Sequence, residues 1–428
     1  MHRFREKFSA YTVYLIFSGA GYFFSTLVTT IDMVYQVEVA KLDPLQLVLV
    51  GTALEVVCFI CQVPTGVLAD VYSRRLAVIL GTLIVGAGFI LQGSIPTFVA
   101  IVIGDALFGV GATLTDGAEQ AWIADEVGVE HVGHVFMRST QMSLLGGLVG
   151  ALISTALASY RLNLPIVLGG ALYVVLAIFL VFFMPERGFQ RKPMQEEHAW
   201  REFGNTFKNG LRAMRVRPVL ITIVFVGLFL GMYSEGFDRL SAAHFLHDFA
   251  FPTFWGLTVV IWFGFFQVAG TLLALVMAEA VRRFADLNKP RQVTLLLFAF
   301  NTLMVISLFI FALAGDFYLA VVAYLAFTTV RSIDNPVYIT WLTQNTEPGV
   351  RATVISLAGQ VDALGQIAGG PPVGLIGTLV SLPAALATSG GILALTLPFL
   401  AFVSRKRKAQ PVSAVIDPVE VASKTNIP

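Results

Sequence analysis

Long apolar segments alternate with short polar breaks along almost the whole chain. Each apolar run is continuous and about 20 residues long, which is the length that a helix needs to cross a hydrocarbon core about 30 Å thick. Membrane-spanning strands would be shorter and would alternate in character, so we expect helices. The pattern predicts twelve spans, at 11–33, 45–67, 76–95, 97–124, 136–160, 164–184, 218–243, 253–279, 292–314, 316–343, 353–379 and 382–403.

The longest polar break divides these predicted spans into two sets of six. We therefore expect an all-α membrane protein with two pseudo-symmetric six-helix bundles, 1–184 and 218–403, joined by a cytoplasmic linker, 185–217, and followed by a disordered tail, 404–428. The linker has apolar residues at helical spacing, namely Trp200, Phe203, Phe207, Leu211 and Met214. This spacing predicts an amphipathic helix on the membrane surface, and a solvated linker is the alternative.

The composition supports a membrane protein. Of the 428 residues, 56% are hydrophobic and 13% are charged, and the mean hydropathy is +0.78, so a soluble protein could not bury the apolar surface. A net charge of +1 without a basic domain gives no indication of nucleic-acid binding. We expect a monomeric multi-pass protein of the cell membrane, which in bacteria is the inner membrane.

Basic residues predict the orientation in the membrane. Of the 28 Lys and Arg residues, 24 fall on one side of the predicted spans, whereas Lys41 and Arg161 lie in loops on the other side. The positive-inside rule then places both termini in the cytoplasm. The two remaining basic residues, Arg239 and Arg331, lie within spans.

The sequence carries no familiar motif for an enzyme. It has no phosphate-binding loop, no His-Glu-x-x-His and no Gly-x-Ser-x-Gly, which disfavours a membrane-embedded enzyme, and we expect no cofactor apart from coupling protons.

Cys58 and Cys61 share one span without a second Cys or His pair, which is typical of core packing. His244 and His247 could bind a metal on the outer face, but a solvated helix end is the simpler interpretation, and we expect no metal site.

A short internal repeat supports the division into halves. Asp116 and Trp122 recur as Asp334 and Trp341, at offsets of 218 and 219 residues. A glycine-rich stretch follows each pair, and small residues there would allow close helix packing. The residues concerned are Gly146 and Gly150 in the first half and Gly365, Gly369 and Pro371 in the second.

The loop after the second predicted span carries the most specific motif. It reads Gly66-Val-Leu-Ala-Asp70-Val-Tyr-Ser-Arg74-Arg75, and it resembles the signature Gly-x-Leu-Ala-Asp-x-x-Gly-Arg-Arg/Lys of the major facilitator superfamily, with Ser73 in place of the second glycine. The resemblance implies a transporter of two six-helix bundles in which spans one, four, seven and ten surround a central cavity.

The charges of this loop predict a conformational latch. A carboxylate and two guanidinium groups at a cytoplasmic turn can form charge-assisted bonds to neighbouring helix ends, and a glycine lets two helices approach closely. We expect the latch to favour the outward-open state and to break in the inward-open state, and a static surface ion pair is the alternative. Its members would be Gly66, Asp70, Arg74, Arg75, Asp125 and Arg138.

Charged residues inside the predicted spans are candidates for a functional site, because they are costly in lipid. In the fourth span, residues at i, i+4, i+7, i+11 and i+14 would share one helix face, namely Asp105, Gly109, Ala112, Asp116 and Glu119. The others are Glu55, Glu235, Asp238, Arg239, Arg331, Asp334 and Asp362, with Asp32 near the outer end of the first span. Helical spacing lets Arg239 pair with Glu235, and Arg331 with Asp334.

Carboxylates outnumber guanidinium groups within the spans by eight to two. Such an excess is stable in a low dielectric only if several of these carboxylates are protonated at neutral pH, which suits a proton-coupled carrier. We expect Asp116 and Glu119 to form the coupling pair, with Asp32 and Glu235 as the next candidates. Buried acids that only join helices are the alternative.

The acidic, phenylalanine-rich lining favours neutral or cationic amphiphiles as substrates. In this respect the chain resembles the drug:proton antiporter branch of the family, whose members export lipophilic compounds from bacteria. A proton-coupled importer of a nutrient and an exporter of siderophores or lipids are the alternatives, because one fold serves both directions.

Overall fold

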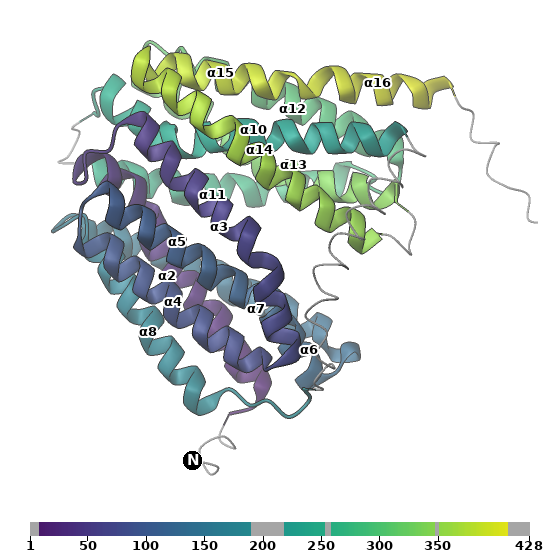
Figure 1. Cartoon of the computed structure of the whole chain (residues 1–428). Helices are drawn as coiled ribbons and strands as arrows, with labels where there is room; N and C mark the ends of the chain where they lie inside the picture. The colour runs from purple at the N-terminus through teal and green to yellow at the C-terminus, as the bar shows by residue number, and fades with distance from the viewer. Residues whose placement is uncertain (1–7, 190–217, 253–257, 347–350, 410–428) are drawn as a thin grey trace, which may run out of the picture.

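The computed structural model describes residues 8–189, 218–252, 258–346 and 351–409, and every regular element within these ranges is a helix. The predicted surface helix of the linker and the tail beyond residue 409 lie outside the described residues. The expected all-helical membrane fold is confirmed (Figure 1).

Two bundles follow one another along the chain, coloured purple to blue and teal to yellow in Figure 1. The first contains α2 (Ala10–Glu38), α3 (Pro44–Val71), α4 (Arg74–Ser94), α5 (Phe98–Thr115), α6 (Ala118–Val127), α7 (Val129–Ala158) and α8 (Leu164–Phe183). The second contains α10 (Pro218–Asp248), α11 (Val259–Phe284), α12 (Pro290–Ala312), α13 (Phe317–Gln344), α14 (Arg351–Leu379), α15 (Leu382–Ala394) and α16 (Thr396–Ala409).

Eleven segments of the described residues are long and apolar enough to cross a membrane, with Phe98–Val127 and Leu382–Val403 each counted as one. The remaining predicted span, 353–379, corresponds to α14, which has 29 residues but contains polar side chains such as Gln360, Asp362 and Gln366. It packs against α10 and α3 rather than standing apart, so its polar positions are sheltered by protein.

The polar breaks begin helices by capping their first turn. Asp43 accepts a hydrogen bond from the backbone N–H of Gln46, whose side chain accepts one in return, and Pro44 follows directly. Ser73, Thr97, Asp316 and Ser381 cap α4, α5, α13 and α15 in the same way. Short polar loops can therefore end one span and start the next.

The sequence pattern predicted one continuous helix for the fourth span, but the structure has two helices there. Helix α5 ends at Thr115, Asp116 is extended, and Gly117 has φ of +73° before α6 begins. Glycine adopts this left-handed conformation without the steric cost that other residues meet. The expected single acidic face therefore breaks at Asp116, which is exposed, and Glu119 belongs to a separate helix.

Glycines bring neighbouring helices into backbone contact. A Cβ atom at Gly104 of α5 would lie 2.9 Å from the carbonyl oxygen of Gly88 in α4. Gly146 and Gly150 of α7 face the backbone of α2, and Gly365 and Gly369 of α14 face the backbone of α10. Close helix approach of this kind is a common source of stability where lipid supplies no hydrophobic driving force.

The two bundles meet where α3 begins and α14 ends. The backbone N–H of Leu45 donates to Oγ1 of Thr378 at 3.0 Å, and a Cβ atom at Gly377 would lie 2.8 Å from Cβ of Pro44. A separate small cluster joins α2, α7 and α11 through Ile31, Val34, Ala158 and Val260. The positive-inside rule assigns this end to the outer side of the membrane.

We predict that Gly104→Val lowers the stability of the protein. The added side chain would overlap the Gly88 region of α4, and overpacking of this kind costs about 1–3 kcal/mol. Thermal unfolding of the purified protein measures the effect. Gly391→Val is the control, because nothing lies within 4 Å of a Cβ atom at Gly391. Equal unfolding temperatures for the two variants would contradict the packing assigned to α4 and α5.

Candidate functional site

A cavity of about 800 Å³ lies within the C-terminal bundle, between α10, α13 and α14. Its walls combine aromatic rings with carboxylates. The aromatic residues are Tyr233, Phe237, Tyr324 and Tyr338, and the acidic residues are Asp238, Asp334 and Asp362. Arg331 is the one basic residue among those that line it. The volume is in the range of pockets that hold drug-sized molecules.

Arg331 of α13 forms a bidentate ion pair with Asp238 of α10. Its Nη2 lies 2.7 Å from Oδ2, and its Nη1 donates to Oδ1. The guanidinium also stands over the rings of Tyr233 and Phe237, at 5.8 and 5.9 Å from their centroids. The expected pairing of Arg331 with Asp334 is wrong, because Asp238 offers both carboxylate oxygens in the planar geometry that a guanidinium prefers.

Asp334 belongs instead to a buried chain of hydrogen bonds. Its Oδ1 accepts from Nδ2 of Asn301 at 3.0 Å, and Oδ1 of Asn301 accepts from the hydroxyl of Thr396 at 3.0 Å. The chain therefore joins α13, α12 and α16. On α14, Asp362 accepts a hydrogen bond from Gln366 at 2.9 Å, so two of the three cavity carboxylates are held by amides.

A second cavity of about 540 Å³ lies within the N-terminal bundle. Glu119 is the one charged residue among those that line it, and it is surrounded by hydroxyl and aromatic groups that include Tyr14, Ser139 and Tyr173. Asp116 is exposed and is not among the lining residues. The structure thus brings Glu119 into a cavity wall and separates it from its predicted partner.

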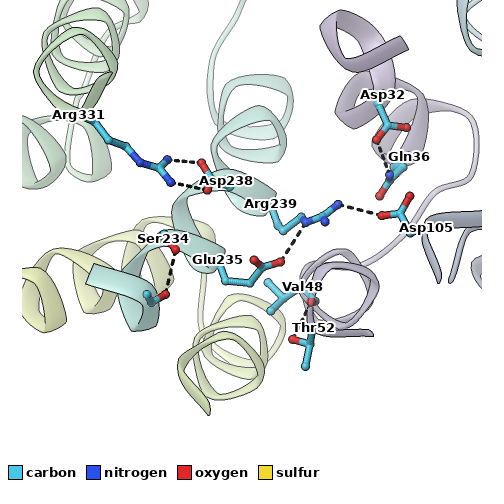
Figure 2. A network of polar contacts seen from close by, with 11 residues as sticks. Asp32, Gln36, Val48, Thr52, Asp105, Ser234, Glu235, Asp238, Arg239 and Arg331 are labelled. Carbon is cyan, nitrogen blue, oxygen red and sulfur yellow. Dashed lines mark hydrogen bonds and ion pairs between the residues drawn. The ribbon is translucent and has the colours of Figure 1, made fainter. Parts of the chain in front are cut away.

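An ion-pair network crosses from one bundle to the other. Nε of Arg239 lies 3.0 Å from Oε1 of Glu235 within α10, and Nη1 lies 3.4 Å from Oδ2 of Asp105 in α5 (Figure 2). The Arg239 side chain is only 12% exposed. Gly51 of α3 leaves the room for this network, because a Cβ atom there would overlap Glu235 and Arg239. The expected Glu235–Arg239 pair is present, with Asp105 as a partner from the other bundle.

Asp32 lies beside this network and is held by two amides that sequence analysis missed. Its carboxylate accepts from Nε2 of Gln36 at 3.0 Å and from Nε2 of Gln92. Glutamines within apolar spans were the available signal, because a buried amide needs polar partners. Glu55 of α3, by contrast, has no hydrogen bond or ion pair to any described residue, although it interacts electrostatically with Glu235 and Asp362.

Hydrogen bonds and ion pairs join the signature loop, residues 66–75, to α6 and to Glu186. Nη1 of Arg74 donates to Asp125 and to the carbonyl oxygen of Ala121 at 2.8 Å, while Nη2 lies 3.7 Å from Asp70. Glu186, which sequence analysis missed, accepts from the Ser73 hydroxyl at 2.7 Å and from the Arg75 backbone N–H at 3.0 Å.

Two other predicted members of the latch stand apart from these bonds. Arg138 donates to Gln141 of its own helix at 3.2 Å. A Cβ atom at Gly66 would have nothing within 4 Å, so this glycine is not at a close helix contact among the described residues. The structure therefore brings together Asp70, Arg74 and Asp125, with Glu186 bound to the adjoining residues.

The described ranges contain no group of three or more His, Cys, Asp or Glu residues that could hold a metal ion. His244 is buried rather than solvated, and its ring nitrogens contact Asp248 at 2.6 Å and the carbonyl oxygen of Phe311 at 3.1 Å. Cys58 and Cys61 are free thiols within α3.

We predict that Asp105→Asn destabilises the protein by about 1–3 kcal/mol, because it removes a charged partner of the buried Arg239. A double-mutant cycle with Arg239→Gln, followed by thermal unfolding, measures the coupling between the two residues, which we expect to be about 0.5–3 kcal/mol. Glu38→Gln is the control, because its pair with Lys41 is exposed and should contribute little. A coupling energy of zero would show that the bridge carries no stability.

Comparison with known proteins identifies the family. The sequence profile of the Major Facilitator Superfamily matches residues 11–370. An uncharacterized MFS-type transporter of Bacillus subtilis, YxaM, is 22% identical over 80% of this chain and 83% of its own length. The multidrug resistance protein MdtH of Salmonella arizonae is 29% identical over 32% of this chain and 35% of its own.

A solved structure gives the same fold across nearly the entire chain. A bacterial homologue of the human lysosomal transporter Spinster, in an inward-facing and unoccupied conformation, has a TM-score of 0.70 at 13% identity. The match covers 97% of this chain and 100% of that one. The profile match over residues 11–370, together with the two helical bundles, places the chain in the Major Facilitator Superfamily, a family of membrane transporters and not of enzymes.

Proposed function

We propose that this chain is a proton-coupled secondary transporter that works by alternating access and exports lipophilic neutral or cationic molecules. The observation that carries the proposal is the charge of the C-terminal cavity. Three carboxylates line its walls, and the one guanidinium among the lining residues, Arg331, is already held by Asp238. An anionic substrate would find no available positive partner on these walls, whereas a cation would be attracted.

The aromatic residues of the cavity extend this argument to substrate shape. Tyr233, Phe237 and Tyr324 line one continuous region, and the Phe237 and Tyr324 rings are stacked with centroids 5.8 Å apart. Flat apolar groups can pack on such faces, and a cationic group gains further from the ring quadrupoles. A lipophilic cation satisfies both the rings and the acids.

Proton coupling would use the carboxylates that face the cavities. Glu119 is the one charged group on the N-terminal cavity wall. Glu55 lines neither of the two cavities described above, but it is half-buried and has no hydrogen bond or ion pair with a described residue, so it is a second candidate. Carboxylates in such surroundings are candidates for proton relays. Asp116 remains part of the proposed coupling pair, because it is exposed next to the Gly117 break and only three residues before Glu119.

The relatives bear on direction only weakly. MdtH is named as a multidrug resistance protein, but its match covers about a third of each chain, and YxaM is named as uncharacterized. Only the name of MdtH supports export, and neither name indicates a substrate. A nutrient importer would have the same fold, so the direction of flux must be measured.

The experiment uses purified full-length protein in liposomes with a pH-sensitive dye inside and an imposed pH gradient. We expect a lipophilic cation such as ethidium to move in the direction opposite to the protons, with a matching change of the internal pH. We expect sugars to produce no pH change. Glu119→Gln combined with Asp116→Asn should reduce the coupled pH change to the level of empty liposomes. Glu130→Gln, at an exposed position on α7, is the control and should retain it. Undiminished coupling in the double variant would refute the role of this pair.

The latch hypothesis gives a second expectation. Asp70→Asn and Asp125→Asn should each slow transport. Each substitution removes a carboxylate that binds Arg74, and the latch hypothesis requires these bonds to stabilise the outward-open state. The rate per transporter is measured in liposomes at equal protein content. Unchanged rates in both variants would support a static ion pair instead.

A further inference from the structure

Two buried amide oxygens near the outer end of the N-terminal bundle, those of Gln36 and Gln92, have no hydrogen-bond donor among the described residues. Both Asp32 oxygens accept from the amide nitrogens of Gln36 and Gln92. These bonds leave the amide oxygens of both glutamines without a partner, although both side chains are fully buried at 0% exposure. A buried acceptor without a partner costs about 1–3 kcal/mol, so two of them beside one carboxylate call for an explanation.

Negative charge is also in excess at this place. Arg239 is shared by Glu235 and Asp105, and it interacts electrostatically with Asp32 as well. One guanidinium therefore faces three carboxylates from α2, α5 and α10. Unneutralised charge of this kind is expensive in a low dielectric, and a bound cation would relieve it.

We propose a binding site for Na⁺ between α2, α4 and α5, formed by Asp32, Gln36, Gln92 and Asp105. Carboxylate and amide oxygens are the ligands that hard metal ions prefer. In Figure 2 the amide of Gln36 lies between the carboxylates of Asp32 and Asp105, and Asp32 interacts electrostatically with Asp105. The ion would take the unpartnered amide oxygens and the oxygens of both acids.

The charge of the site selects a monovalent ion. Arg239 lies within ion-pair distance of Asp105, so Asp32 is the one acid among the four proposed ligands that has no ion pair with a described residue. The amide oxygens add ligands without adding charge. Calcium sites usually gather six to eight oxygens, several of them from carboxylates, and the four side chains here offer fewer charges than such sites do.

The site is connected to the contact between bundles. Asp105 would serve both as a ligand for Na⁺ and as the partner of Arg239 across the interface, at the long distance of 3.4 Å. Na⁺ would therefore compete with Arg239 for Asp105 and weaken the contact between α5 and α10. Occupation of the site would favour separation of the bundles at the outer side, which links ion binding to alternating access.

The test measures Na⁺ binding to the purified full-length protein at pH 8, by isothermal titration calorimetry with NaCl and by thermal unfolding in NaCl against choline chloride of equal ionic strength. We expect saturable binding and a higher unfolding temperature in Na⁺. Asp32→Asn should abolish both effects, and Gln92→Met should weaken Na⁺ binding by at least about tenfold, the loss typical even of residues that only support metal ligands.

Gln267→Met is the matched control, because Gln267 is exposed on α11 and its substitution should leave Na⁺ binding unchanged. Equal unfolding temperatures in Na⁺ and choline, or an Na⁺ effect that persists in Gln92→Met and Asp32→Asn, would overturn the proposal. Stabilisation by lower pH without any effect of Na⁺ would also overturn it and would make this a proton site. The binding test does not depend on the proposed drug export, so either can fail alone.

Discussion

The buried guanidinium of Arg239 is the constraint on which the arrangement of the two bundles depends. A positive charge in this place must be met by carboxylates, and the structure supplies one from its own helix, Glu235, and one from the opposite bundle, Asp105. The contact can break only if another cation, a proton or a rearranged side chain takes over that charge balance. This makes the interface responsive to the ions and solutes that a transporter moves.

The remaining charges divide between two kinds of role. Arg331 and Asp238 neutralise each other within the C-terminal bundle and hold α13 to α10, whereas Glu119 and Glu55 form no ion pair with any described residue. The C-terminal cavity also has Asp334 and Asp362 in its walls, whereas Glu119 lies in the wall of the N-terminal cavity. The acids and the stacked aromatic rings of the C-terminal cavity favour lipophilic cations over anions.

The helices could be predicted from sequence because hydropathy and length are local properties. Most predicted boundaries lie within about five residues of the helix ends, although α7 begins seven residues before the predicted start at 136. Capping by Asp43 and Ser73 marks where two of the helices begin. The break at Gly117 was missed, because a glycine in an apolar run does not reveal that its φ is positive. Helical periodicity then assigned Asp116 and Glu119 to one face that the backbone does not form.

Pairings between helices were harder to predict than pairings within one. Spacing along α10 predicted the Glu235–Arg239 pair, but nothing local indicated that Asp238 would bind Arg331 or that Asp105 would cross to Arg239. Such partners depend on how helices pack, and one sequence does not show that. Gln36 and Gln92 donate hydrogen bonds to Asp32. Sequence analysis did not select them, because it searched the spans for charged residues and these amides are neutral.

The charge bridge between the bundles can be tested by measuring a distance. Spin labels at Val39 and Leu379, which are exposed at the C-terminal ends of α2 and α14, would report the separation of the outer ends of the two bundles by double electron–electron resonance, after Cys58 and Cys61 are replaced by alanine. We expect one short distance in the parent protein and an added longer population in Arg239→Gln. Identical distance distributions in the two proteins would contradict the account.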